Sequence, residues 1–291
     1  MNIIQKVIFR CRLLYLRRTN LLEYNKAMYY YTLGREIDLN NPKTLDEKII
    51  YMSFFTDTTL WSRCADKVAV RDYVKELGYG YMLNEVYGVY ENTQQIDYDK
   101  LPSEFVIKTN HASGTNIIVK NKEDLDIVKT NKQIERWLKM DYSKVSGDPH
   151  YSRIKPLILI EKLLSDNSSY NTKTSLADFK FFCVNGTPIA VEMMTDRFNH
   201  THKRRFYDME WKPKDEWMLE GFPVAELSEK PVPFEEMKKA AETLSKDFCF
   251  VRVDFYVINN KPIFGELTFT PGVTECSRLF QEELGAKLIL P

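Results

Sequence analysis

The segment from Arg252 to Thr274 reads RVDFYVINNKPIFGELTFTPGVT, in which two alternating runs are joined by a turn and followed by Pro-Gly. This pattern predicts a β-hairpin. Because side chains alternate along a strand, Arg252 and Asp254 share one face. If the loop is the three-residue segment 259–261, Asp254 lies opposite Glu266 across the ladder. The hairpin then brings two carboxylates together.

Two acids facing each other destabilise a sheet unless a cation lies between them. Oxygen ligands suit Mg²⁺, which takes one or two protein carboxylates and completes its shell with water and phosphate. The alternative is a surface hairpin whose acids face water. The neighbouring residues favour the metal site. Arg252 lies two residues before Asp254, and Pro271-Gly272 follows Glu266.

Composition sets limits on the class of protein. The chain has 291 residues, 44% hydrophobic and 13% aromatic, which is enough for a large core divided into two or three lobes. Its 41 basic and 41 acidic residues cancel, so we expect no nucleic-acid partner. The five scattered cysteines contain no Cys-x-x-Cys, which argues against a disulfide framework and a zinc knuckle and favours a reducing cytoplasm. We expect no membrane span, because no stretch approaches about 20 apolar residues.

The first 22 residues are basic, with Lys6, Arg10, Arg12, Arg17 and Arg18 and no acid. Their apolar residues recur at helical spacing. The segment is either a basic amphipathic helix lying on an anionic membrane or a helix packed on its own domain. We favour the packed helix and expect at most weak peripheral membrane contact through residues 1–20.

Further elements follow from local patterns. Thr44-x-x-Glu47 predicts a capping box that opens a helix, and a second helix is expected from Asp66 to Gly78. We expect a strand over residues 81–90 and a linker over residues 99–103. After it, strands are predicted at 105–108 and 116–120, joined by the loop 110–115. Small residues in that loop can bring N–H groups near phosphate, although an ordinary hairpin tip is the alternative.

Local patterns also predict the elements of the second half of the chain. We expect a helix over 124–140, a loop over 145–154, a buried strand over 156–160 and a flexible insertion over 165–177. Asn185-Gly186 predicts a hairpin between strands 178–184 and 188–194. A loop-rich basic region is expected over 195–233 and a helix over 234–247. His200 and His202 in that region are expected in a solvent-exposed loop, because two histidines alone do not make a zinc site.

The hairpin motif resembles the metal-binding hairpin of the ATP-grasp ligases, with Thr268 where most of the superfamily has a metal-binding Asn. The resemblance implies an α/β (α+β) ATP-grasp fold with the nucleotide held between a small lid lobe and a C-terminal antiparallel-sheet lobe. It divides the chain into an N-terminal helical and α/β region (1–100), the lid lobe (101–163) and the C-terminal lobe with the metal-binding hairpin (164–291). The cofactors implied are ATP and Mg²⁺.

The resemblance also implies roles for individual residues. Phosphate contacts are expected from Lys67 and Lys108, and lid closure from Ser113 and Gly114. Glu161 is expected to receive the adenine amino group and Leu163 and Leu164 to contact the ring; Lys162 and Lys180 complete the expected nucleotide-binding set, although Lys180 has no counterpart throughout the superfamily. Asp178 is expected to hold the ribose, with Asp166 as the alternative. Catalysis is expected from Arg252, Lys108 and the Gly272 N–H, and metal binding from Asp254, Glu266 and Thr268.

Within the superfamily the chain looks closest to the TupA-like branch, which is associated with bacterial surface polysaccharides. The residues that carry this are Asn41-Pro-Lys-Thr44 with Glu47-Lys48, Asp66-Lys67 with Val68-Ala-Val-Arg71, FVIKTNHASGTNIIV, LIEKLL, DFKFFCVNG and FGELTFTPG. The resemblance implies an ADP-forming carboxylate–amine ligase that joins a uronic acid of a capsular or other surface polysaccharide, or its precursor, to an amino acid or amine. The alternatives are a phosphotransferase acting on a sugar and a catalytically weak nucleotide-binding regulator. We expect a cytoplasmic enzyme, with the inner face of the membrane as a second location.

The basic residues of the 195–233 region are candidates for holding an anionic sugar acid. They are Arg197, Lys203, Arg204 and Arg205. A solvated basic loop is the alternative for each of them.

Overall fold

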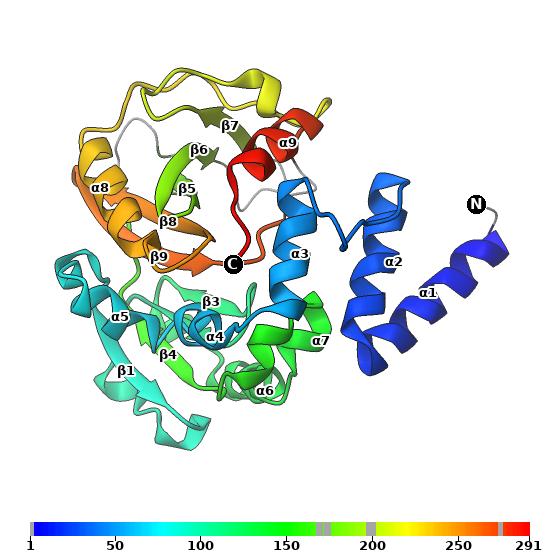
Figure 1. The fold of residues 1–291 in the computed structure, drawn as a ribbon. Coiled ribbons are helices and arrows are strands. Elements are labelled where there is room, and N and C mark those ends of the chain that lie inside the picture. Colours follow the sequence, from blue (N-terminus) through cyan, green and yellow to red (C-terminus); the bar gives the residue numbers. More distant parts are fainter. Residues whose placement is uncertain (1–2, 167–170, 172–175, 196–201, 273–275) are drawn as a thin grey trace.

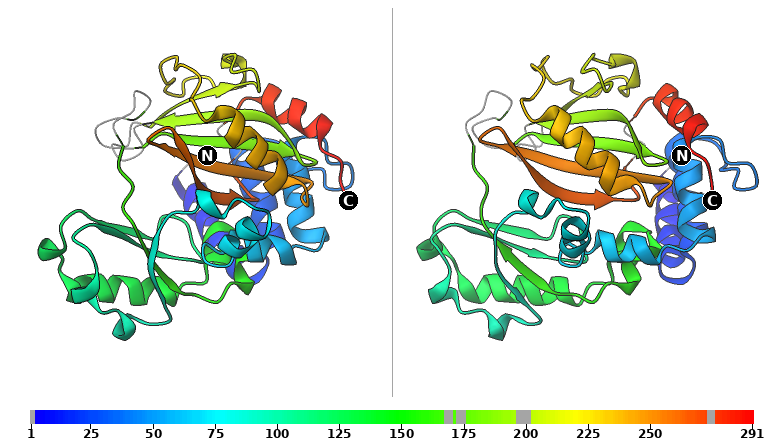
Figure 2. Two further views of the ribbon diagram at one scale, coloured as in Figure 1. Left: turned by 90° about the vertical axis from the view of Figure 1, so that its left-hand side faces the viewer. Right: turned by 60° about the vertical axis from the view of Figure 1, so that its left-hand side comes forward.

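The chain folds into a mixed α/β structure with two antiparallel sheets, as expected. The computed structural model describes residues 3–166, 171, 176–195, 202–272 and 276–291, with side chains from residue 7 onward. The two sheets form separate layers, one in each half of the molecule (Figures 1 and 2). None of the described helices is long and apolar enough to cross a membrane.

Helices surround the two sheets. Those of the described residues are α1 (Ile3–Thr19), α2 (Leu21–Leu33), α3 (Leu45–Phe55), α4 (Thr59–Ala65), α5 (Val70–Glu76), α6 (Ile127–Leu138), α7 (Tyr142–Ser146), α8 (Phe234–Ser245) and α9 (Arg278–Lys287). The predicted capping box opens α3, with both the Thr44 and Glu47 side chains in their capping roles. Figure 1 shows α1 and α2 projecting from one side of the molecule.

The smaller sheet has four strands in the order β1-β4-β2-β3. They are β1 (Val86–Tyr90), β2 (Phe105–Thr109), β3 (Asn116–Val119) and β4 (Ile158–Glu161). Phe105, Ile107 and Ile160 form its own small core together with Ile134 of α6. The sheet thus has an apolar face on α6. The division of the chain at residues 100 and 163 stays a prediction.

The larger sheet has five strands in the order β7-β6-β5-β8-β9. They are β5 (Asp178–Val184), β6 (Thr187–Thr195), β7 (Lys203–Tyr207), β8 (Phe250–Ile258) and β9 (Lys261–Thr268). Helix α8 covers one face, where the Phe234 ring lies 5.6 Å from that of Phe181. Val251, Val253 and Phe255 are fully buried, so the alternation predicted for β8 is confirmed. The polar residues of β8 occupy the opposite face.

The central hairpin reaches the predicted pairing by a different route. Asp254 pairs with Glu266, as expected. The prediction of a three-residue loop over 259–261 is wrong, because Asn259 and Asn260 form a two-residue turn with positive φ at both positions. The register is restored by a bulge at Gly265, between the Asp254 and Phe255 pairs. The shorter turn and the extra residue compensate each other.

Two predicted elements begin later than expected. Helix α5 begins at Val70 and not at Asp66, because the Asp66 carboxylate accepts the N–H groups of Val68 and Ala69 and holds a turn there. The strand predicted to end at Tyr90 begins only at Val86, since residues 80–82 form a 3₁₀ turn. Gly78, with φ +88°, marks the end of the α5 region as predicted.

Several elements were not predicted. Helices α2 and α9 lie outside the predicted set, and the segment 145–154 contains part of α7 and a 3₁₀ helix, Pro149–Arg153, instead of a loop. Strand β7 lies inside the region expected to be loop-rich. Its basic residues suggested a solvated loop, but Arg204 is buried there beside Glu192.

Candidate active site

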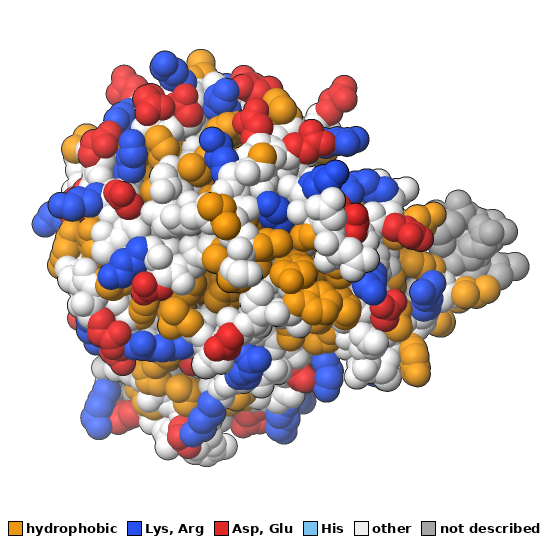
Figure 3. All heavy atoms as spheres, in the orientation of Figure 1, with side chains coloured by type: hydrophobic (Ala, Val, Ile, Leu, Met, Phe, Trp, Pro, Cys, Tyr) orange, Lys and Arg blue, Asp and Glu red, His pale blue; other side chains and the backbone are white. Residues whose placement is uncertain are grey.

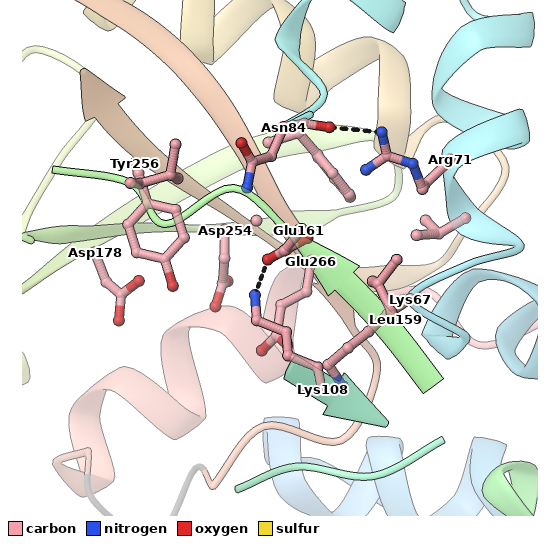
Figure 4. Close-up of a pocket in the computed structure, with 14 residues that line it drawn as sticks. Lys67, Arg71, Asn84, Lys108, Leu159, Glu161, Asp178, Asp254, Tyr256 and Glu266 are labelled. Carbon is pink, nitrogen blue, oxygen red and sulfur yellow. Dashed lines mark hydrogen bonds and ion pairs between the residues drawn. The ribbon is translucent and has the colours of Figure 1, made fainter. Parts of the chain in front are cut away.

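A pocket lies between the two sheets, and many of the predicted site residues line it. Figure 4 shows it. Its lining residues are Lys67, Val70, Arg71, Asn84, Lys108, Leu159, Glu161, Leu164, Asp178, Asp254, Tyr256, Phe264, Gly265 and Glu266. Strands β2 and β4 contribute from one side, and β5, β8 and β9 from the other. The predicted residues that therefore face one shared space include Lys67, Lys108, Asp178, Asp254 and Glu266.

Two lysines enter the pocket from the side of the smaller sheet. The ammonium of Lys67 donates to the Ala112 carbonyl oxygen at 2.7 Å. Burial lowers the pKa of Lys67, and so does the neighbouring charge of Lys108, while Glu266 acts in the opposite direction. Lys108 forms an ion pair with Glu161, which Figure 4 marks with a dashed line. A phosphate anion between the two lysines would compensate their charges.

The Glu161 carboxylate is paired within the chain, since it is buried and accepts from Lys108. Its expected contact with the adenine amino group stays a prediction. The adjoining main chain is held by Asn84, whose side-chain amide donates to the Lys162 carbonyl oxygen at 2.8 Å. Of the residues that follow Glu161, Leu164 lines the pocket, whereas Lys162 and Leu163 do not.

The loop after β2 is fixed at its base and exposed at its tip. Asn110 receives the Leu157 N–H at 2.6 Å and donates to the Lys155 carbonyl oxygen at 3.0 Å. Ser113 and Gly114 are exposed, and Gly114 has φ +72°. Neither lines the pocket. The predicted lid loop lies beside the pocket through Lys67, which donates to the carbonyl oxygens of Ala112 and Asn110.

The acids of the larger sheet are tightly bound to cations. Arg252 donates to both Asp254 carboxylate oxygens at 2.7 Å, and its Nη2 lies 3.5 Å from the Glu266 carboxylate. Lys180 lies 2.6 Å from Asp254 and 3.5 Å from Asp178. Burial lowers the pKa of Arg252, but the carboxylates of Asp254 and Glu266 raise it well above the ordinary value. Arg252 consequently stays cationic.

This charged set continues across the sheet. Lys180 pairs with Glu192 in the β5–β6 register, and the Glu192 carboxylate lies 3.1 Å from Arg204. The guanidinium of Arg204 stacks 4.0 Å over the Phe222 ring. Burial raises the pKa of Glu192, while Arg204 and Lys180 act against it. A row of alternating charges thus runs from β7 to the pocket.

The donor set fits Mg²⁺ held jointly with phosphate. No group of three or more His, Cys, Asp or Glu that could hold a metal occurs in the part of the chain that the structure describes. Asp254 and Glu266 reach the same Arg252 nitrogen, so the two carboxylates converge. Two carboxylates with phosphate and water are what Mg²⁺ uses in such sites. Thr268, the third predicted metal ligand, contacts Glu266, because its hydroxyl donates to that carboxylate at 3.1 Å.

Other predicted residues lie at different places. Of the two candidate ribose acids, Asp178 lines the pocket, whereas Asp166 accepts the Asn259 N–H at 3.3 Å outside it. Gly272 is exposed and does not line the pocket. Arg205 pairs with Asp215 at 2.9 Å. Arg197 and His200 lie outside the described residues.

Sequence reasoning missed several lining residues, among them Arg71, Asn84 and Tyr256. Arg71 donates to the Asn84 carbonyl oxygen at 2.7 Å and closes one end of the pocket (Figure 4). Tyr256 lies two residues after Asp254 on β8, so the same alternation that placed Asp254 could have placed it. No local pattern pointed to Asn84.

A second polar group lies beside the pocket, around Asp148. Burial raises the pKa of Asp148 to about 6, while the hydroxyls of Ser146 and Thr270 act against it. Burial also raises the pKa of Tyr151, and the charges of Glu266 and Asp148 raise it further. These side chains therefore share one electrostatic neighbourhood with Glu266.

Comparison with known sequences identifies the family. The family described as TupA-like ATP-grasp matches residues 47–289. The chain belongs to the TupA-like ATP-grasp family. The predicted ATP-grasp fold is thereby confirmed, and ATP-grasp enzymes use ATP and Mg²⁺. No curated protein matches the chain.

Solved structures similar to this chain include the following ligases and a synthetase. D-alanine–D-alanine ligase from Bacillus anthracis is 17% identical, with 78% of this chain and 65% of that chain covered and a TM-score of 0.48. The enzyme of the same name from Helicobacter pylori is 15% identical, with 78% and 59% covered and a TM-score of 0.42. The ADP complex of purK, N5-carboxyaminoimidazole ribonucleotide synthetase, is 10% identical, with 74% and 47% covered and a TM-score of 0.46. This TupA-like chain spans less than two thirds of each.

Proposed function

We propose that this TupA-like protein is an ATP-dependent carboxylate–amine ligase that activates a carboxylate as an acyl-phosphate. The observation that carries the proposal is the pocket in which Lys67 and Lys108 face Asp254 and Glu266. Lysines can hold phosphate oxygens, and the two acids can hold Mg²⁺. Arg252 lies at the junction of the two acids and adds fixed positive charge where the reacting carboxyl would lie.

The residues of the pocket would act first on ATP. Lys67 is half-buried and lacks a carboxylate within 4.0 Å among the described residues, so a phosphate oxygen is a suitable partner for it. Lys108 would exchange Glu161 for a phosphate oxygen. Asp254 and Glu266 would hold Mg²⁺, which supplies charge neutralisation on the phosphates.

The reaction needs a carboxylate made electrophilic. An oxygen of the substrate carboxylate attacks the γ-phosphorus of ATP; the new P–O bond forms as the bond to ADP breaks. The amine nitrogen then attacks the carbonyl carbon, the C–O bond to phosphate breaks, phosphate leaves with the electron pair, and the nitrogen loses its proton. Arg252 stabilises the negative charge that develops on the carbonyl oxygen, because its raised pKa keeps it charged.

For the substrate, we propose a uronic acid of a bacterial surface polysaccharide or its precursor, with an amino acid or amine as acceptor. Membership of the TupA-like family supports this choice. Among the basic candidates for the sugar acid, Arg204 and Arg205 are disfavoured, since they already bind Glu192 and Asp215. The substrate carboxyl would instead lie at Arg252.

A phosphate-release assay tests the proposal. D-glucuronate and D-galacturonate are each combined with a panel of amino acids, and ADP, phosphate and amide are measured together. The proposal expects all three in equal amounts. Glu266→Gln should abolish turnover, whereas Glu226→Gln, an exposed acid of the same half of the chain, should not.

Two results would contradict the proposal. A stable phosphorylated sugar without amide would indicate a phosphotransferase. ATP binding without turnover for any pair would indicate a nucleotide-binding regulator.

A further inference from the structure

The arm, defined as α1 and α2 (residues 3–33), extends away from the rest of the molecule (Figure 1). One face of α1 packs on α2, where the Phe9 ring stacks on Tyr31 with centroids 4.8 Å apart. Helix α1 also contacts α7. One face of the helix is thus packed on its own chain.

Another face of α1 is apolar and exposed to solvent. Ile8 and Tyr15 are 64% and 66% exposed, and Val7 and Leu14 are also more than half exposed. With Cys11 between them, their spacing puts all of them on one side of the helix. Single exposed apolar residues are common, but a continuous stripe marks a contact surface. Apolar side chains lie at the surface of the described part of the arm in Figure 3.

Arginines border this apolar stripe. At 3.6 residues per turn, Arg10 and Arg17 lie along one edge, Arg12 lies along the other, and Arg18 continues the stripe. Residues 3–19 contain no acid, although basic and acidic residues balance at 41 each over the whole chain. The arm therefore concentrates positive charge around an apolar face.

We propose that the arm binds the surface of an anionic lipid bilayer, with α1 lying in the plane of the interface. The apolar stripe would enter the boundary between headgroups and acyl chains, and the flanking arginines would meet lipid phosphates. The exposed Tyr15 suits this depth, because tyrosine has an apolar ring and a polar tip.

Charge argues against a second copy of the chain as the occupant. Two α1 stripes packed together would bring the arginine edges of both copies side by side, with no acid in either helix to pair with them. Like charges across an interface weaken association. An anionic bilayer instead offers an apolar boundary to the stripe and lipid phosphates to the arginines along its edges.

Vesicle sedimentation with the full chain tests the inference. Phosphatidylcholine vesicles are compared with vesicles that also contain phosphatidylglycerol. We expect binding to the anionic vesicles only, weakened by added salt. The double variant Ile8→Asp with Leu14→Asp should lower the partition coefficient at least tenfold, and Arg12→Gln about fivefold. The control is Val128→Asp, which places a single aspartate at an 80% exposed position of α6 and should bind like the wild type.

Three outcomes would overturn the inference: no binding by the wild type, equal binding to both vesicle types, or equal binding by the wild type and the double variant. Lipid-free self-association that the double variant abolishes would also overturn it and identify a second copy as the occupant. Equal melting temperatures show that the variants fold. The assay contains no ATP, so its result is independent of the proposed ligase activity.

Discussion

Lys180 lies 2.6 Å from Asp254 and 3.5 Å from Asp178, and all three side chains are buried. One ammonium thus binds two acids that line the pocket from neighbouring strands. Their charges are held in place by a group that does not itself line the pocket.

Removing this ammonium should destabilise the protein. We expect Lys180→Met to lower the free energy of unfolding by about 3 kcal/mol or more, because loss of one partner leaves buried charge uncompensated. Urea denaturation measures it. Lys246→Met, at an exposed position after α8, is the control and should have little effect. Equal stability of the two variants would show that the buried contacts of Lys180 contribute nothing net.

The bulge at Gly265 should tolerate no side chain without a shift. A Cβ at this position would lie 3.0 Å from the Asp254 carbonyl oxygen, which is backbone and has little freedom to move. We expect Gly265→Ala to lower the free energy of unfolding by about 1–3 kcal/mol and to reduce turnover, since it displaces Glu266 from Asp254. The stability control is Gly272→Ala, where a Cβ meets nothing within 4 Å. Wild-type stability and activity in Gly265→Ala would refute the role of the bulge.

The raised pKa of Asp148 predicts a pH dependence of stability. The folded protein holds this proton more tightly than the unfolded chain, so Asp148 costs stability as pH rises from its ordinary pKa, near 4, through its folded pKa of about 6. We expect Asp148→Asn to gain stability relative to the wild type across this window, by up to about 3 kcal/mol. Denaturation of both proteins at pH 4 and pH 8 measures the difference. A constant difference would mean that the pKa of Asp148 is not raised.

Lys67 should contribute mainly to nucleotide binding. We expect Lys67→Met to weaken ATP binding about 10- to 100-fold, because a hydrogen bond to a charged group contributes about 1.5–3 kcal/mol. Isothermal titration with ATP and Mg²⁺ measures the affinity. Lys75→Met removes a lysine from the exposed side of α5, paired with Asp72, and should leave the affinity unchanged. If both variants bind ATP equally, Lys67 does not contact it.

The sequence predicted local patterns well and long-range contacts poorly. The pairing of Asp254 with Glu266 followed from strand alternation, even though the turn is one residue shorter than predicted and Gly265 forms a bulge. The contact of Lys180 with Asp254 joins residues 74 positions apart. Nothing in either local segment encodes it, because strand order in a sheet is set by tertiary packing.

The same reason explains the elements that were missed. Strand β7 has three consecutive basic residues, a pattern typical of a solvated loop. Its Arg204 is buried only because Glu192 on β6 and the ring of Phe222 surround it. The ion pair between Lys108 and Glu161 was missed for a similar reason, since it joins β2 to β4. A resemblance to a family supplied roles for these residues but not their partners in the folded chain.

The proposed ligase activity requires that the pocket transfer the γ-phosphoryl group of ATP to a carboxylate. A substrate whose two carboxylate oxygens carry oxygen-18 tests this transfer, followed by mass analysis of the released phosphate. We expect one labelled oxygen in each phosphate, because the oxygen that attacks the γ-phosphorus leaves with the phosphoryl group when the amide forms. Unlabelled phosphate, or release of AMP and pyrophosphate instead of ADP and phosphate, would contradict it.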